Sequence, residues 1–204
     1  MNVARPRHDH LAVAFTKEGK WDEAISQNRE ILQLKPDDAG AHHELGLALF
    51  GMGRIDEAIA QYRDAIRLKP GDADFHYALG VACFKKGETA EAVQQYEETI
   101  RLNPKDADAH NNLGNALGKQ GRADEAIVQY NEAIRLEPDH KDAHYNLGVA
   151  LFGKGRIDAA IAQFQDAVRL QPDNADAQNN LTYLLKLRQK SDAQQSGPAS
   201  AAGH

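Results

Sequence analysis

The chain has 204 residues, with 24 basic and 30 acidic side chains and a single cysteine, Cys83. The net charge of −6 excludes the broad basic surface of a nucleic-acid-binding protein, and one cysteine excludes an intrachain disulfide and a cysteine metal cluster. The apolar runs are too short to span a bilayer and the first residues lack the apolar core of a signal peptide, so we predict a cytoplasmic protein without membrane insertion.

Proline and glycine recur along the chain at intervals of 34 residues. Five of the seven prolines keep this interval: Pro36, Pro70, Pro104, Pro138 and Pro172. Glycines keep it from Gly46 to Gly148 and from Gly19 to Gly155. A unit of this length cannot bury its own apolar face, so neighbouring copies must stack. The period predicts an N-terminal extension at residues 1–4 and five repeats at residues 5–38, 39–72, 73–106, 107–140 and 141–174.

Each repeat reads as two helices joined by a glycine turn. The first helix of the second repeat follows a predicted N-cap, Asp38, and carries apolar residues at helical spacing, as at Leu45 and Leu49. The second helix follows Gly53 and ends before Pro70, because proline cannot continue the hydrogen-bond ladder. Arginines in its last turn lie three residues after an acidic residue, which predicts exposed ion pairs on a solvated face.

A glycine recurs inside the first helix, as at Gly80 and Gly114, and a small alanine inside the second, as at Ala92 and Ala126. Glycine within a helix costs about 0.5–1 kcal/mol relative to alanine. Its recurrence therefore predicts that the two helices approach closely at this point.

The pattern resembles the tetratricopeptide repeat. The fourth repeat supplies the motif residues Leu113, Gly114, Leu117, Ala126, Tyr130, Ala133 and Pro138. The resemblance covers residues 5–174 and implies an all-α, right-handed superhelical solenoid of five helix-turn-helix repeats. The first repeat departs from the pattern, with Ala12 in place of the glycine and Asn28 in place of the aromatic residue.

The chain after the fifth repeat copies only a first helix. Thr182 replaces the helix glycine, and Lys186, Arg188 and Lys190 make the segment polar. We predict a solvating capping helix at residues 175–190 and a disordered tail at residues 191–204, where periodicity is lost.

Histidine occupies the fourth position of every repeat, at His8, His42, His76, His110 and His144. Equivalent positions lie a whole helix pair apart, too far to share one metal ion. These residues are instead predicted to be half-buried between helices, and Cys83 to be a buried apolar residue. Neither a nucleophile–base arrangement nor a phosphate-binding loop is found. We therefore predict a protein that is not an enzyme, with no cofactor and no metal site.

The resemblance implies that the first helices line a concave groove, with their second, fifth, sixth, ninth and twelfth positions facing it. Apolar and aromatic residues stand there, and such a patch is typical of an interaction site. They are His43, Leu47, Phe50, Tyr77, Val81, Phe84, Tyr145, Val149 and Phe152. The alternative is that Phe50, Phe84 and Phe152 fold into the core.

Asparagines share this predicted surface at Asn112, Asn115, Asn146 and Asn180. An amide offers both a donor and an acceptor, so such a ladder could hold a peptide backbone. In this the chain is similar to the repeat arm of O-linked N-acetylglucosamine transferases. The alternative is an ordinary solvated helix face. The carboxylate clamp of related repeats needs basic residues where this chain has Asn111, Asp176 and Asn180, which argues against an acidic tail as ligand.

The resemblance thus implies a scaffold that binds a protein or peptide partner, as an extended peptide or partner helix, in the groove. Two alternatives stay open. The chain could be the substrate-recruiting arm of a larger glycosyltransferase, or it could self-assemble as a homo-oligomer through its terminal repeats or its groove.

Overall fold

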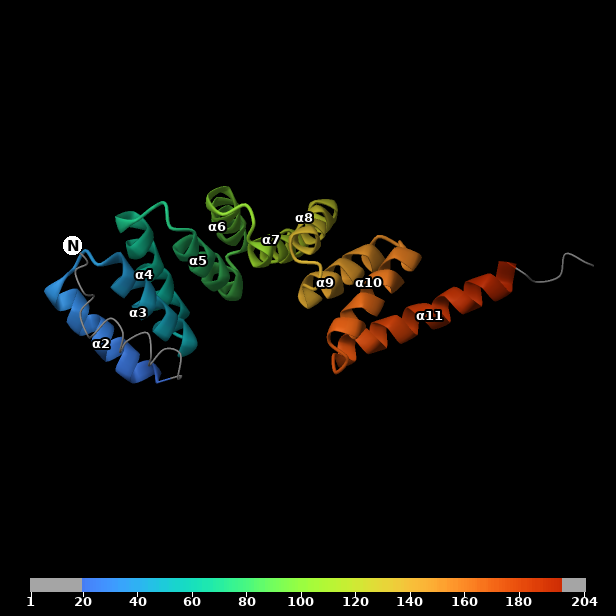
Figure 1. Ribbon diagram of the computed structural model, residues 1–204, viewed down its shortest axis with the longest axis horizontal. Helices are drawn as coiled ribbons and strands as arrows, with labels where there is room; N and C mark the ends of the chain where they lie inside the picture. The colour runs from blue at the N-terminus through green and yellow to red at the C-terminus, as the bar shows by residue number, and fades with distance from the viewer. Residues whose placement is uncertain (1–19, 196–204) are drawn as a thin grey trace, which may run out of the picture. The chain divides into compact units, whose positions relative to one another are not determined.

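The computed structural model describes residues 20–195, which form ten helices and no strand (Figure 1). The N-terminal extension, the first helix of the first repeat with His8 and Ala12, and residues 196–204 lie outside the described residues. The helices are α2 (Trp21–Leu34), α3 (Ala39–Gly51), α4 (Ile55–Leu68), α5 (Ala73–Lys86), α6 (Thr89–Leu102), α7 (Ala107–Lys119), α8 (Ala123–Leu136), α9 (Lys141–Gly153), α10 (Ile157–Leu170) and α11 (Ala175–Gln195). The all-α class is confirmed.

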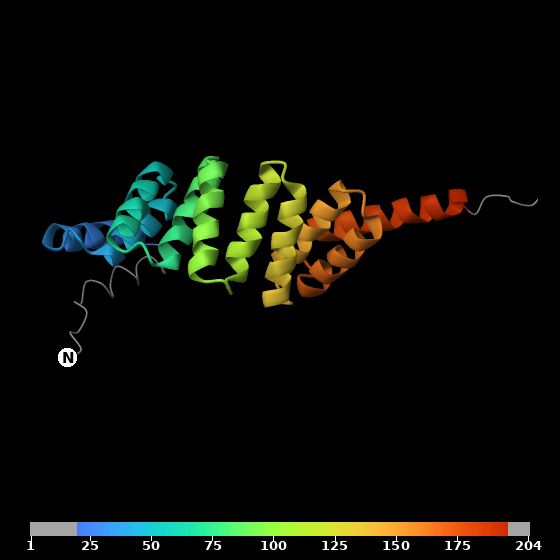
Figure 2. The ribbon, with the colours of Figure 1, turned by 90° about the horizontal axis from the view of Figure 1, so that it is seen from above.

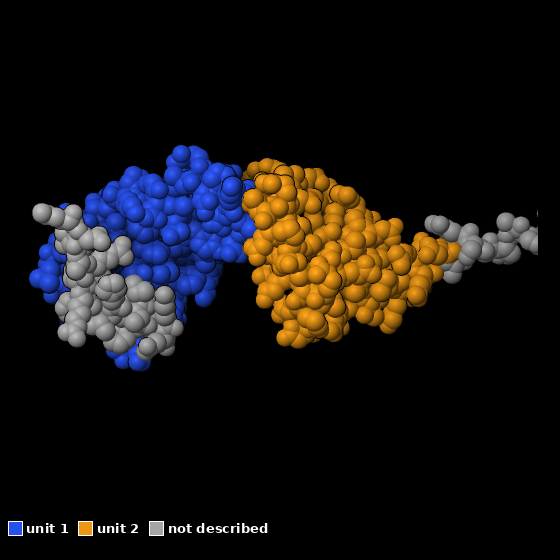
Figure 3. All heavy atoms as spheres, viewed as in Figure 1, with its two compact units in different colours: residues 1–116 blue, residues 117–204 orange. Residues whose placement is uncertain are grey.

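The chain divides into two compact units, residues 1–116 and residues 117–204 (Figure 3). In the first unit α3 packs on α4 and α5 on α6, and α4 also contacts α5. In the second unit α9 packs on α10, which also contacts α11. Figure 2 shows the helices of each unit joined by short turns.

Side-chain caps start the first helices where the sequence predicts them. The Ala41 amide donates to Asp38 Oδ1 at 3.0 Å, and the Ala177 amide donates to Asn174 Oδ1 at 3.0 Å. Asp106 accepts in the same way from Ala109. Each cap satisfies one amide that the helix itself leaves unpaired.

The turn between the two helices of a repeat requires glycine. Gly53, Gly87, Gly121 and Gly155 adopt positive φ angles of 77°, 93°, 79° and 71°. Side chains with a Cβ rarely adopt this conformation, so the 34-residue recurrence of this glycine has a steric cause.

The helix glycine also has a steric cause, but the group that it accommodates is a ring. A Cβ at Gly46 would lie 2.5 Å from Tyr62 Cε1, and one at Gly80 would lie 2.8 Å from Tyr96 Cε1. Tyr62 and Tyr96 are each 1% exposed and form the core with the fully buried alanines of the second helices. The predicted close approach is confirmed, and the aromatic residue that causes it was not identified from the sequence.

Asn28 replaces this aromatic residue in α2 and is 1% exposed. Its Nδ2 donates to the carbonyl oxygen of Ala24, one helical turn back, at 2.9 Å. The buried amide nitrogen is therefore satisfied within its own helix.

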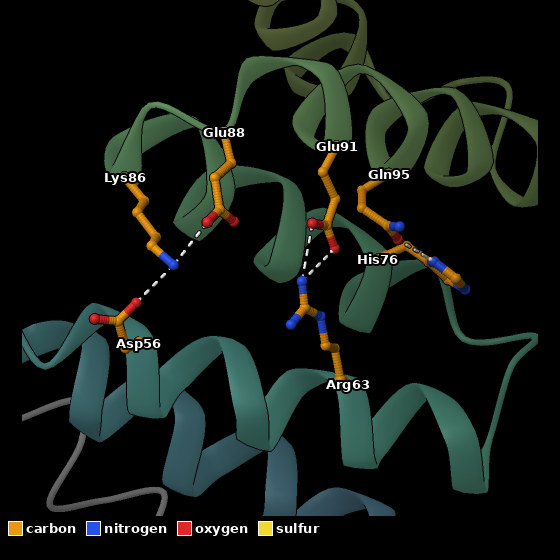
Figure 4. Close-up of polar contacts among 7 residues, drawn as sticks. All are labelled: Asp56, Arg63, His76, Lys86, Glu88, Glu91 and Gln95. Carbon is orange, nitrogen blue, oxygen red and sulfur yellow. Dashed lines mark hydrogen bonds and ion pairs between the residues drawn. The ribbon is translucent and has the colours of Figure 1, made fainter.

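Ion pairs stabilise the surface of each unit. The predicted pairs within a helix are present, for example Arg101 with Glu98 at 2.6 Å. Pairs also join successive repeats: Lys86 contacts Asp56 at 2.7 Å, and Arg63 contacts Glu91 at 2.8 Å (Figure 4). All of these side chains are partly exposed, so each pair contributes roughly 0–1 kcal/mol.

The last helix, α11, differs from its prediction. It runs to Gln195, so residues 191–195 of the predicted tail are helical. These residues contain no helix breaker, and the next glycine and proline in the sequence are Gly197 and Pro198. The helix also exposes Tyr183 and Leu187, with exposed fractions of 56% and 38%, so the polar cap carries apolar residues.

Candidate peptide-binding site

A pocket of about 300 Å³ lies between α3 and α5 in the first unit. We call it the α3–α5 pocket. Its lining residues are His43, Leu47 and Phe50 of α3, Tyr62 of α4, and Asp74, Tyr77, Ala78 and Val81 of α5. A cavity of about 150 Å³ holds a benzene molecule, so this pocket has room for two large apolar side chains.

Five of the predicted groove residues meet in this pocket. His43, Leu47 and Phe50 follow one another at helical spacing along α3, and Tyr77 and Val81 lie four residues apart on α5. The lining on each helix extends over eight residues, from His43 to Phe50 and from Asp74 to Val81, which is a rise of about 10 Å. All five are half-buried. Phe50 is thus only partly buried, within the lining of the pocket.

The predicted residue Phe84 is half-buried and lies outside the lining of this pocket. One helical turn before it, Val81 lines the pocket wall. Lys85 Nζ lies 4.7 Å from the centre of the Phe50 ring, a cation–π contact that places a positive charge beside the pocket.

Tyr62, which lines the pocket from α4, has a hydroxyl without a hydrogen-bond partner in the described part of the chain. The residue is 1% exposed. Burial raises the pKa of Tyr62 above its usual range, so the phenol stays protonated.

Tyr77 and Asn112 form a second polar feature beside the pocket. Asn112 Nδ2, on α7, donates to Tyr77 Oη at 2.9 Å. Burial raises the pKa of Tyr77 to about 12, so its phenol keeps its own proton. The predicted ladder residue Asn112 therefore has one donor committed to Tyr77. Its Oδ1 stays available as an acceptor beside the Tyr77 O–H donor.

His43 is the ionisable residue that sits among the apolar groups of the pocket. Its ring centre lies 4.9 Å from that of Phe75 and 5.8 Å from that of Tyr62. Burial lowers the pKa of His43, and the nearby carboxylates of Asp74 and Asp72 partly oppose this shift. The imidazole is therefore neutral at pH 7, and the negative charge of Asp74 at the rim is not cancelled by it.

The remaining predicted residues lie mainly on the second unit. Val149 and Phe152 of α9 are 44% and 37% exposed, and the Phe152 ring meets the Tyr183 ring edge-on at 6.0 Å. The half-buried members of the set are Tyr145 and Asn146 on α9, Asn180 on α11, and Asn115 on α7 in the first unit. Sequence reasoning missed Tyr183, although it holds the ninth position of its helix, the register of Val81 and Val149.

The repeated histidines have a structural role in the described repeats. His76 Nε2 donates to the carbonyl oxygen of Pro70 at 3.0 Å. Its Nδ1 lies 2.8 Å from the side-chain amide oxygen of Gln95 (Figure 4). His42 and His144 repeat both contacts with their own proline and glutamine. Each imidazole thus joins the two helices of a repeat to the preceding turn. The glutamine partner, nineteen residues further on, was not recognised from the sequence.

Cys83 is a buried free thiol, as predicted, and burial raises its pKa to about 12. Its Sγ and carboxylate oxygens of Glu88 and Glu91 lie within 4.8 Å of one another, a grouping that sequence reasoning missed. Glu91 binds Arg63 through both oxygens at 2.8 Å, and Glu88 binds Lys86 at 2.6 Å (Figure 4). Both carboxylates therefore already hold protein cations.

The comparisons with known proteins define the class of this chain. The tetratricopeptide repeat family matches residues 43–107, 84–131 and 111–175, and a second model of the repeat matches residues 13–53. The chain belongs to the tetratricopeptide repeat family. A search of curated proteins found no match.

Solved structures share this fold. The structure of MamA is 28% identical, with a TM-score of 0.74 over 81% of this chain and 97% of that one. That of YrrB, described as a TPR protein with an unusual peptide-binding site, is 25% identical, with a TM-score of 0.73 over 84% and 89%. PilF of Pseudomonas aeruginosa is 19% identical, with a TM-score of 0.82 over 93% and 86%, and shows the fold alone.

The family match and the solved structures of MamA and YrrB together support a role for this chain as a protein-interaction scaffold. None of the helices between residues 20 and 195 is long and apolar enough to cross a membrane. The cytoplasmic location, the absence of an enzymatic activity and the possible homo-oligomer stay predictions.

Proposed function

We propose that this chain is a non-enzymatic scaffold that binds an extended peptide or a partner helix in the predicted concave groove, with the α3–α5 pocket as its main anchor. The observation that carries the proposal is the pocket itself, where five residues chosen from the repeat register surround a space large enough for two side chains. The unusual peptide-binding site described for YrrB adds support from a protein of the same fold.

The polar groups beside the pocket favour an extended peptide over a helix. Tyr77 offers an O–H donor and Asn112 an amide oxygen next to it. A peptide backbone presents the complementary carbonyl and N–H groups only when it is extended, because a helix uses them internally. The two side chains therefore fit one exposed peptide unit of a ligand.

The expected affinity is modest. Burying one large apolar side chain contributes about 1.5–3 kcal/mol, so two contribute roughly 3–6 kcal/mol before the costs of association. A Kd of 1 mM corresponds to about 4 kcal/mol and one of 1 μM to about 8 kcal/mol. After these costs we expect a Kd of about 1 mM or weaker from the pocket alone, with tighter binding when a ligand also reaches other groove residues.

Weak binding of this kind is best tested by covalent capture. A photoreactive benzoyl-phenylalanine placed at Phe50 should cross-link a synthetic peptide rich in apolar residues, because Phe50 lines the pocket. The same group at Leu34, an 81% exposed residue of α2, is the control. Two results would show that the pocket is not the binding site. One is equal cross-linking at Phe50 and Leu34, and the other is cross-linking at Phe50 that persists when Val81→Trp fills the pocket.

A further inference from the structure

We infer that the α3–α5 pocket selects an extended segment with two large apolar side chains and a lysine or arginine at the Asp74 end. This inference rests on the proposed function and adds the chemistry of the ligand. The charges around the pocket and the length of its lining carry it.

The charges at the two ends of the pocket differ in sign. Asp74 lines one end, is exposed and has no ion-pair partner among residues 20–195. Its neighbour Asp72 is already paired with Lys69. At the other end, Lys85 lies over the Phe50 ring and has no acidic partner in the described part of the chain. A basic residue of the ligand therefore gains a partner beside Asp74 and meets repulsion beside Lys85.

The neutral His43 leaves this charge pattern intact. It lines the same pocket as Asp74, and burial lowers its pKa, so it supplies no positive charge at pH 7 that could satisfy the carboxylate. The Asp74 carboxylate thus remains a hydrogen-bond acceptor for an incoming ammonium or guanidinium group.

The length of the pocket sets the spacing of the apolar side chains. The lining covers about 10 Å along each helix. Side chains two residues apart on an extended chain point to the same side and are separated by about 6.6 Å. Two such side chains fit the pocket, and Asp74 lies within reach of the residue that precedes or follows them.

The test is a selection of random dodecapeptides displayed on phage, performed on the full chain and on three variants. Val81→Trp fills the pocket, and Asp74→Lys reverses the charge at its rim. Asp142→Lys is the matched charge control, because Asp142 is exposed at the equivalent position of α9 and is not ion-paired in residues 20–195. Thermal melts followed by circular dichroism confirm that each variant is folded.

The expected result is a set of peptides that the parent enriches and Val81→Trp does not, with a basic residue beside two apolar residues in alternate positions. Compared with the parent, synthetic versions of these peptides should bind Asp74→Lys about three- to tenfold more weakly and Asp142→Lys equally well. Replacing the basic residue of the peptide by glutamate should restore binding to Asp74→Lys. Pocket-dependent peptides without a charge preference would overturn this inference and leave the proposed function standing. A selection with no pocket-dependent peptide would overturn both.

Discussion

Replacing Gly46 by alanine tests how the fold and the pocket depend on one another. In an open helix this change stabilises by about 0.5–1 kcal/mol, because alanine loses less backbone entropy on folding. At Gly46 the new Cβ would lie 2.5 Å from Cε1 and 2.7 Å from Cδ1 of the Tyr62 ring. Real Cβ atoms do not come so close to a ring carbon, so the ring or the helix must move.

The ring has little room to move, because Tyr62 is 1% exposed and packs against His43 at 5.8 Å. Overpacking of a core costs typically about 1–3 kcal/mol, which outweighs the gain in helix propensity. We expect Gly46→Ala to lower the free energy of unfolding by about 0.5–2 kcal/mol. Tyr62 also lines the α3–α5 pocket, so peptide binding should weaken at temperatures where the variant is still folded.

The assay is urea unfolding followed by circular dichroism, with Gly153→Ala as the control. Gly153 ends α9, and a Cβ there would meet no atom within 4 Å other than those of its chain neighbours and its own helix backbone, so the same substitution should be neutral or stabilising. A Gly46→Ala/Tyr62→Leu double variant should lose less stability than the sum of the single losses, since the clash is with the ring. If the free energy of unfolding of Gly46→Ala equals that of Gly153→Ala, the packing argument is refuted.

Three further predictions concern other parts of the described chain. Asp38→Ala should lower the free energy of unfolding by about 0.5–2 kcal/mol in urea, because the Ala41 amide loses its cap, whereas Asp37→Ala should have little effect. On α11, Leu184→Ala should cost about 2–5 kcal/mol, because Leu184 is 0% exposed. Tyr183→Ala should cost only about 0.5–1.5 kcal/mol, because Tyr183 is 56% exposed and loses mainly its edge-on contact with Phe152. The Cys83 thiol should react with a disulfide reagent at pH 8 only after unfolding. Burial raises the pKa of the Cys83 thiol to about 12 in the folded state. The stabilisation that Cys83 contributes is therefore complete below the pKa of the unfolded thiol and is lost as the pH increases toward 12. Measuring the free energy of unfolding at increasing alkaline pH would detect this loss.

The sequence predicted the fold because the repeat encodes it many times. The turn glycine, the N-cap aspartate and the helix glycine each recur, and each has one steric or hydrogen-bonding cause in the structure. Features without recurrence were predicted less well. The end of α11 was placed at residue 190 instead of Gln195, because no periodic residue marks it and the nearest helix-breaking residues in the sequence, Gly197 and Pro198, come later.

The candidate site was predicted in part. The repeat register identified His43, Leu47, Phe50, Tyr77 and Val81, because the face of a helix follows from its period. It could not identify Tyr62, which reaches the pocket from the second helix, or the pairing of Asn112 with Tyr77, thirty-five residues apart. Such contacts depend on how successive repeats pack, which the sequence of one repeat does not specify.

One period therefore carries two kinds of residue on the same helix. Positions such as Gly46 are fixed, because each must accommodate the same ring from its partner helix. Positions such as Leu47, its immediate neighbour in sequence, face the pocket and vary among leucine, valine, asparagine and tyrosine from repeat to repeat. Because the stability of the fold depends on the helix glycines, the positions that face the pocket can change with little loss of stability. Ligand chemistry in this chain is thus expected to follow the residues that vary between repeats, and the α3–α5 pocket, lined by His43, Leu47, Tyr77 and Val81, is where they come together.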